Sequence, residues 1–166
     1  MEYIDSSNNQ KINENIFEKQ PETCIFCDYA KSDKDDENLI LLRGDFSYAL
    51  MNRYPYSVGH LLITTYRHTS DLLSLSDEEK LEIFTLSQKS VSLLKTIMNT
   101  DGFNIGMNLG KIAGAGINTH LHLHVVPRWN GDINFMSVTA ETKVLPEALS
   151  VTRRKILDHL NSWDNQ

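Results

Sequence analysis

Residues 120–126 read His-Leu-His-Leu-His-Val-Val, and this alternation of polar and apolar residues constrains the fold more than any other part of the chain. A period of two predicts a β-strand, because successive side chains of a strand point to opposite faces of its sheet. His120, His122 and His124 are therefore expected on one face, with the apolar residues between them facing a hydrophobic core. Three of the chain's six histidines lie in this short run, so their face is a candidate functional surface.

Three explanations for this histidine face compete. The first is a solvated polar face, but threonine or lysine would serve that purpose as well as histidine. The second is one metal ion bound by all three histidines. That is difficult because the outer two lie about 13 Å apart on a flat strand, whereas a zinc–nitrogen bond is about 2.0–2.1 Å long. The third is a phosphate-reacting centre, in which one neutral imidazole attacks phosphorus and another donates hydrogen bonds. Strand geometry favours the third.

A loop rich in small residues comes shortly before this strand. Residues 110–116 read Gly-Lys-Ile-Ala-Gly-Ala-Gly, with three glycines and two alanines around Lys111. Such a loop can turn its backbone N–H groups toward an anion, although on its own it usually marks only a turn. Its position beside the histidines favours a phosphate-binding function.

Short apolar runs separated by turn residues predict the other strands of an antiparallel sheet. Their expected ranges are 39–42, 47–52, 60–65 and 103–108. Ser76 and Glu79 form a capping box ahead of apolar residues at helical spacing, which predicts one long helix over 77–99.

A C-terminal helix is expected within 145–160, where Pro146 and Glu147 suit a helix start. The polar stretch 31–38 is expected to be a loop. The predicted fold class is therefore α+β: an antiparallel sheet with one long helix and a C-terminal helix.

The composition suits one domain, since the chain has 166 residues of which 40% are hydrophobic. We expect residues 1–20, rich in Asn, Ser and charge, to form a flexible arm and residues 21–166 to form the domain. The formal net charge of −6 argues against binding of nucleic acid polymers but allows a locally positive pocket for a small anion. No apolar run approaches the roughly 20 residues of a membrane span, and the N-terminus lacks a signal-peptide core. We therefore expect a cytoplasmic protein without membrane association.

Cys24 and Cys27 are the only cysteines. In a reducing compartment such a CxxC pair is more often metal-binding or redox-active than a structural disulfide. Two thiolates at this spacing suit one zinc ion, and a complete site needs two further ligands, for which His68 and His120 are candidates. The alternative is a reduced pair without metal.

The run of alternating histidines and apolar residues, closed by two valines, resembles the histidine triad (HIT) family. Residues 47–63, SYALMNRYPYSVGHLLI, look like the nucleotide-binding strand pair of fragile histidine triad proteins. Residues 114–136, GAGINTHLHLHVVPRWNGDINFM, are similar to the bacterial diadenosine tetraphosphate phosphorylase-like branch. The resemblance covers about 24–160 and implies a HIT-like α+β fold.

The resemblance implies catalytic roles for three histidines. His122 would attack the α-phosphorus of a nucleotide and form a nucleotidyl-histidine intermediate, with its other ring nitrogen donating to the carbonyl of His120. His124 would bind the phosphate or bridging oxygen, and His60 would help to orient or neutralise it.

Nucleotide-binding residues are also implied. Asn52 matches a position that contacts the ribose, Asn108 one that contacts the phosphates or the leaving group, and the amides near Ala115 and Gly116 would stabilise phosphoryl charge. The hydroxyl residue that many relatives carry three positions before the triad is Ile117 here, so its side-chain contact is lost.

Relatives with an N-terminal CxxC imply a zinc ion held by Cys24, Cys27, His68 and His120. With four protein ligands this zinc would be structural, and no organic cofactor is expected.

Three functions are compatible with this pattern. The first is cleavage of a purine dinucleoside polyphosphate by a hydrolase or phosphorylase. The second is hydrolysis of adenosine phosphoramidates or aminoacyl adenylates, and the third is nucleotide sensing with little turnover. The resemblance also implies a homodimer, in keeping with the apolar character of more than one face of the long helix.

Overall fold

The computed structural model describes residues 24–132 and 147–163, and the predicted arm over 1–20 lies outside them. The helices are α1 (Ile25–Lys31), α2 (Asp35–Asn38), α3 (Asp77–Met98) and α5 (Leu149–Trp163), with 3₁₀ turns at Leu72–Ser74 and Lys111–Ala113. The strands are β1 (Ile40–Arg43), β2 (Ser47–Met51), β3 (Leu61–Thr65), β4 (Gly102–Met107) and β5 (His122–Arg128).

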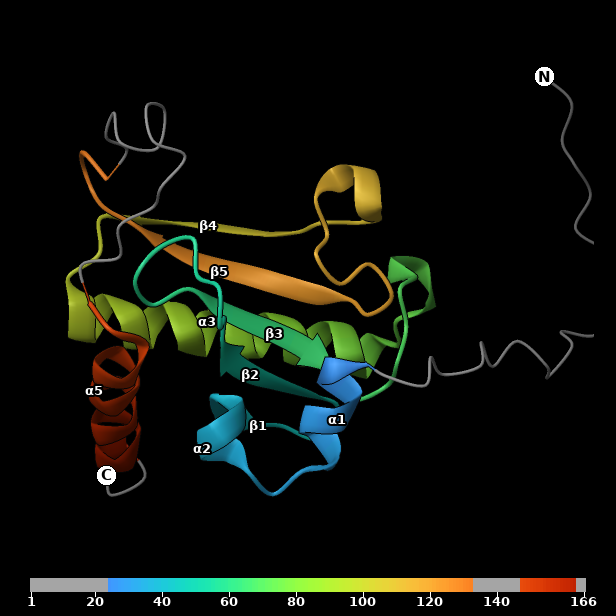
Figure 1. Ribbon diagram of the computed structural model, residues 1–166, viewed down its shortest axis with the longest axis horizontal. Coiled ribbons are helices and arrows are strands. Elements are labelled where there is room, and N and C mark those ends of the chain that lie inside the picture. The colour runs from blue at the N-terminus through green and yellow to red at the C-terminus, as the bar shows by residue number, and fades with distance from the viewer. Residues whose placement is uncertain (1–23, 133–146, 164–166) are drawn as a thin grey trace, which may run out of the picture.

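The five strands form one antiparallel sheet in the order β1-β2-β3-β5-β4 (Figure 1). The sheet, the long helix α3 and the C-terminal helix α5 confirm the predicted α+β class. The strand β5, which carries His122 and His124, is an interior strand between β3 and β4, so backbone hydrogen bonds hold it on both sides. No helix among the described residues is long and apolar enough to cross a membrane.

One face of the sheet packs against α3 and α5. Alternate residues of the strands point to this face, because side chains of a strand alternate between its two sides. The buried cluster contains Ala49, Met51, Leu61, Ile63, Leu121, Leu123 and Val125 from the sheet side and Ile83, Leu86, Leu93, Leu94 and Ile156 from the helices. The apolar residues of the histidine strand therefore face the core, as predicted.

The opposite face carries the histidines and is partly covered by α1. A second buried cluster lies here, made of Cys24, Phe26, Cys27, Ile40, Tyr48, Leu50 and Leu62. Figure 1 shows α1 in front of β2 and β3, with α3 behind the sheet. The helix α1 thereby brings the CxxC pair to the sheet face on which the histidines lie.

The long helix α3 begins with the predicted capping box. The hydroxyl of Ser76 accepts from the backbone N–H of Glu79, and the carboxylate of Glu79 accepts from the N–H of Ser76. One turn further on, the carboxylate of Glu82 accepts from the backbone N–H groups of Asp45 and Phe46, each at 2.7 Å. This fixes α3 to the β1–β2 hairpin.

Three local predictions need correction. The stretch 31–38 contains the helical turn α2, which ends at Leu39 in the left-handed conformation. The C-terminal helix begins at Leu149, two residues after Glu147. His120 precedes β5, because the N–H of Leu121 bonds to the carbonyl of Thr69 and not to β3.

Candidate functional site

Three histidines meet on the face of the sheet that α1 partly covers. His122 and His124 lie two residues apart on β5, and His60 directly precedes β3. The cross-strand partner of His124 on β3 is Leu62, two residues after His60. His60 and His122 are buried and His124 is half-buried. The structure therefore brings together the three histidines predicted to be catalytic.

A hydrogen bond to a backbone carbonyl fixes the ring of His122. Its Nδ1 lies 2.9 Å from the carbonyl oxygen of His120, which is the contact expected from the sequence. A carbonyl oxygen can only accept, so Nδ1 carries the proton and the lone pair of the neutral ring is on Nε2. The contact thus holds the ring in a fixed orientation with Nε2 pointing away from the carbonyl of His120.

His60 and His124 form a direct pair. Nε2 of His60 lies 2.9 Å from Nδ1 of His124. Burial, together with the neighbouring His122, lowers the pKa of His124 from 6.5 to about 4. His124 is therefore neutral at pH 7, and its Nε2 is buried and without a hydrogen-bond partner among the described residues.

The loop between β2 and β3 contacts this pair. The ring of Tyr56 lies nearly parallel to that of His124, with centroids 5.7 Å apart, and 4.7 Å from the ring of His60. The amide nitrogen of Asn52 and the backbone nitrogen of Tyr56 lie 3.3 and 2.9 Å from Nδ1 of His60. The predicted ribose residue Asn52 is thus in contact with the histidine pair.

The glycine-rich loop folds back on Asn108. The amide nitrogen of Asn108 donates to the carbonyl of Gly114 at 3.5 Å, and Gly114 has a left-handed φ of 89°. Ala115 is buried and Gly116 is exposed. The phosphate contacts expected of Asn108, Ala115 and Gly116 stay predictions.

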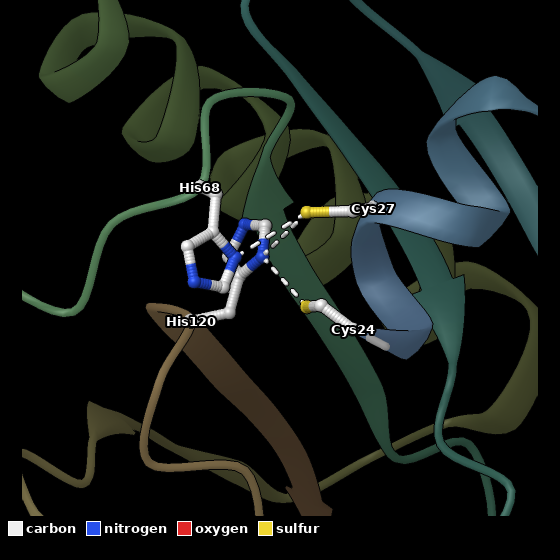
Figure 2. Close-up of side chains that lie close together, drawn as sticks. All are labelled: Cys24, Cys27, His68 and His120. Carbon is white, nitrogen blue, oxygen red and sulfur yellow. Dashed lines mark hydrogen bonds between the residues drawn. The ribbon is translucent and has the colours of Figure 1, made fainter. Parts of the chain in front are cut away.

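A second cluster lies where α1 meets the start of the histidine strand (Figure 2). Its members are Cys24, Cys27, His68 and His120, whose ligand atoms all lie within 4.8 Å of one another. Cys24 Sγ is 3.3 Å from Nδ1 of His120, and Cys27 Sγ is 3.3 Å from Nδ1 of His68 and 3.6 Å from Nδ1 of His120. Tetrahedral zinc with ordinary Zn–S and Zn–N bonds separates its ligand atoms by about 3.3–3.8 Å. The four residues therefore fit one zinc ion.

The orientation of His120 also suits a metal ligand. Its Nε2 lies 2.9 Å from the carbonyl oxygen of Thr65, so Nε2 carries the proton and Nδ1 offers a lone pair to the cluster. Burial is the main reason that the pKa of His120 is lowered to about 4, which keeps the ring neutral. Burial likewise raises the pKa of the Cys27 thiol to about 11, and a bound cation would reverse that preference.

The metal-type cluster is linked to His122 in two ways. The carbonyl of His120 holds the ring of His122, and the ring of Phe26 touches both imidazoles, with centroid distances of 5.4 and 5.3 Å. Phe26 lies between the two cysteines on α1. The cluster is therefore positioned to hold the residues just before β5, and with them the ring of His122, in place.

Sequence reasoning missed Tyr56, Phe26 and Thr65. Phe26 stands inside the CIFC motif, which was a usable signal. Tyr56 acts here through its backbone N–H as well as its ring, and Thr65 through its carbonyl. Backbone contacts of this kind leave no signal in residue identity.

The five-stranded antiparallel sheet with its cluster of histidines on one face defines the class as an α+β domain, and comparison with known proteins gives the family. The HIT domain model matches residues 33–131, so the chain belongs to the HIT family. A zinc-bound histidine triad family protein from Mycobacterium smegmatis has the same fold. It superposes with a TM-score of 0.66 at 23% identity, over 86% of this chain and 96% of that one.

Two relatives have named activities. An AP-4-A phosphorylase from Mycobacterium tuberculosis is 45% identical over 120 residues, which cover 72% of this chain and 62% of the relative. The adenosine 5'-monophosphoramidase HNT1 of Saccharomyces cerevisiae is 31% identical over 105 residues, 63% of this chain and 62% of the relative. The matched part of this chain thus spans less than two thirds of each relative's length.

Proposed function

We propose that this protein cleaves dinucleoside polyphosphates, of the diadenosine tetraphosphate type, at the α-phosphate, as a hydrolase or a phosphorylase. The observation that carries the proposal is the 2.9 Å hydrogen bond from His122 Nδ1 to the carbonyl of His120. Because Nδ1 holds the proton, the free lone pair of the neutral form of this ring is on Nε2, on the same sheet face as His60 and His124. The 45% identity to the mycobacterial AP-4-A phosphorylase supports this substrate class.

In the first step Nε2 of His122 attacks the α-phosphorus. The N–P bond forms while the bond from phosphorus to the bridging oxygen breaks, and the remaining nucleotide leaves. The imidazole becomes cationic, and the carbonyl of His120 stabilises the proton that remains on Nδ1. In the second step water or inorganic phosphate attacks the phosphorus, the N–P bond breaks, and His122 is restored.

The neighbouring polar groups would hold the phosphates. The unpartnered Nε2 of His124 lies on the same face and would hydrogen-bond the bridging oxygen. Asn108 and the amides of Ala115 and Gly116 would contact the phosphoryl oxygens. Asn52 keeps a second N–H and a second lone pair for the ribose beyond the contacts that it already makes.

Product analysis tests the proposal. The protein is incubated with diadenosine tetraphosphate, with and without inorganic phosphate, and separately with adenosine 5'-phosphoramidate. ADP plus ATP formed only with phosphate identifies a phosphorylase, and AMP plus ATP formed in water identifies a hydrolase that acts at the α-phosphate. Two ADP would mean cleavage between the β-phosphates and would contradict attack at the α-phosphorus. AMP from the phosphoramidate alone would support the second candidate, which the identity to the yeast monophosphoramidase favours. Binding of nucleotide without turnover would support a sensor instead.

His122 provides the decisive variant. His122→Ala removes the nucleophile, so turnover should fall by about 10³-fold or more. His159→Gln changes a histidine on α5 and is the matched control, expected to keep wild-type turnover. Wild-type rates in His122→Ala would contradict the mechanism.

We also propose that Cys24, Cys27, His68 and His120 bind a structural zinc ion. The donor set, the spacing of the ligand atoms and the orientation of His120 support it. Zinc would fix α1 to the start of the histidine strand, and with four protein ligands it leaves no position for substrate. Metal analysis of untagged protein purified without added zinc tests this, and a content far below one equivalent that does not change in Cys24→Ser would refute it.

A homodimer is the third part of the proposal. Leu81 and Phe84 on α3 are 70% and 68% exposed, and Ile105 on the edge strand β4 is 49% exposed. Exposed apolar side chains of this size favour burial in an interface. Light scattering should give twice the chain mass for the wild type and a lower mass for a Leu81→Ser, Phe84→Ser double variant. A wild-type monomer at micromolar concentration would overturn this part.

A further inference from the structure

We propose that the loop over 52–60 sets the direction of a hydrogen-bond relay, so that His124 presents Nε2 as a proton donor to the substrate. The relay runs from the Asn52 amide and the Tyr56 backbone N–H to His60, and from His60 to His124. This inference rests on the proposed function only for what the donor does. The direction of the relay follows from the described contacts alone.

The first link has a fixed direction. The backbone N–H of Tyr56 can only donate, and it lies 2.9 Å from Nδ1 of His60. The side-chain oxygen of Asn52 accepts from the backbone N–H of Tyr54 at 3.0 Å, which turns the amide nitrogen of Asn52 toward the same Nδ1 at 3.3 Å. Two donors therefore converge on Nδ1 of His60, and that nitrogen must be the unprotonated one.

The second link follows from the first. Since Nδ1 of His60 accepts, the proton of this ring is on Nε2, which lies 2.9 Å from Nδ1 of His124. Nδ1 of His124 must then accept, and the proton of neutral His124 is on Nε2. That Nε2 is the buried atom without a partner among the described residues. A buried donor of this kind needs an acceptor, which an oxygen of a bound phosphate would supply.

The direction of the relay matters for the reaction. In the opposite direction, Nε2 of His124 would present a lone pair, and it would repel the phosphate and bridging oxygens. With the observed contacts it donates a hydrogen bond to the oxygen on which charge develops as the leaving nucleotide departs. Asn52 and Tyr56 are thus positioning residues that act through His60.

Nitrogen-15 NMR of histidine-labelled protein tests the relay without any turnover. Ring nitrogens with and without a proton differ widely in chemical shift. The wild type should show unprotonated Nδ1 and protonated Nε2 in both His60 and His124. A proton on Nδ1 of either ring in the wild type would overturn the proposal, even if the enzyme cleaves dinucleotides. Lack of turnover with the expected tautomers would refute the proposed function and leave the relay intact.

Asn52→Asp is the informative variant, because it replaces a donor by a group of the same shape that can only accept. The Nδ1 signal of His60 should move toward the protonated range, and an unchanged signal would overturn the role of Asn52. Tyr56→Phe keeps the backbone N–H and should leave both rings in their wild-type tautomers. A change of tautomer in Tyr56→Phe would also count against the relay.

Kinetics separate the relay from the ribose contact. In Asn52→Asp, turnover of diadenosine tetraphosphate should fall by about a hundred-fold, the lower end of the range for a lost proton donor. Turnover of the p-nitrophenyl ester of AMP, whose leaving group needs little help, should fall much less. A weakened ribose contact would lower both rates equally, since both substrates contain the ribose, and equal losses would therefore overturn the proposal.

Discussion

His120 of the metal-type cluster and His124 of the His60–His124 pair lie at opposite ends of one short run of sequence, yet they use their imidazoles in opposite ways. His120, in the cluster, has its Nε2 against the carbonyl of Thr65 and offers a lone pair through Nδ1. His124, in the pair, has its Nδ1 against His60 and offers a proton through Nε2. His122, between them, donates from Nδ1 to a carbonyl and offers a lone pair through Nε2. In each ring, the hydrogen-bond partner of one nitrogen determines whether the other nitrogen carries a proton or a lone pair.

Burial lowers the pKa of His120 and that of His124 to about 4, so the two groups share a charge state at pH 7. The two histidines differ in tautomer, that is, in which ring nitrogen carries the proton, and their hydrogen-bond partners determine this. When one ring nitrogen donates to a backbone carbonyl, the other nitrogen of the neutral ring has a lone pair for a metal or for phosphorus. When one ring nitrogen accepts from an N–H group, the other nitrogen carries the proton and can donate a hydrogen bond to an oxygen.

The largest effect is expected when the metal-type cluster is disrupted. Cys24→Ser should abolish zinc binding and lower the free energy of unfolding by about 3 kcal/mol or more, since a metal that binds only the folded state stabilises it. Denaturant unfolding with zinc analysis checks both effects. Exposed Ser92, on α3, gives the control Ser92→Ala, which should bind zinc and unfold like the wild type.

The turnover that remains in Cys24→Ser tests whether the cluster has a structural or a chemical role. His122 is held by the carbonyl of His120 and not by its ring, so the folded variant should keep the wild-type nucleophile and lose turnover only as the strand loosens. Complete loss of turnover in folded Cys24→Ser would mean that the cluster takes part in the chemistry.

The contrast explains which parts of the molecule the sequence could predict. Periodicity identified the strands, the capping box at Ser76 and the division of the histidine strand into two faces, because burial acts directly on residue type. The four cluster residues were predicted because cysteine and histidine are themselves the ligands. The helix α1 was not predicted, since its seven residues are too few to show a helical pattern.

The relay was not predictable for a different reason. Its first link is a backbone N–H, which every residue except proline has, so the identity of Tyr56 does not reveal it. Asn52 was identified for a ribose contact, and its second contact depends on the turn that brings Tyr54 N–H to its oxygen. The departure of His120 from β5 likewise depends on the carbonyl of Thr69, which is one residue after the cluster residue His68.

A smaller test uses pH. The folded-state pKa of His124 lies below 6.5, so between about pH 6.5 and 4 the unfolded chain binds more protons than the folded one. The free energy of unfolding should therefore fall as the pH falls through this window. For His124 the loss should be about 1–2 kcal/mol after allowance for its partial exposure. Urea unfolding of metal-free protein at several pH values should show a shallower fall in His124→Gln, and equal slopes would contradict the depressed pKa.

The smallest effect is expected at Thr64, which ties the two regions together. Its buried hydroxyl donates to the carbonyl of Leu121 at 2.8 Å, between the cluster residue His120 and the proposed nucleophile His122. Thr64→Val keeps the shape of the side chain and leaves this carbonyl without its donor, so the free energy of unfolding should fall by about 1 kcal/mol. Ser70→Ala, at an exposed position beyond the end of β3, is the control and should change stability little. Because Leu121 lies between the two histidines, Thr64→Val should also lower turnover modestly while zinc stays bound. Loss of zinc with unchanged turnover would mean that this hydrogen bond supports the cluster and not the reactive strand.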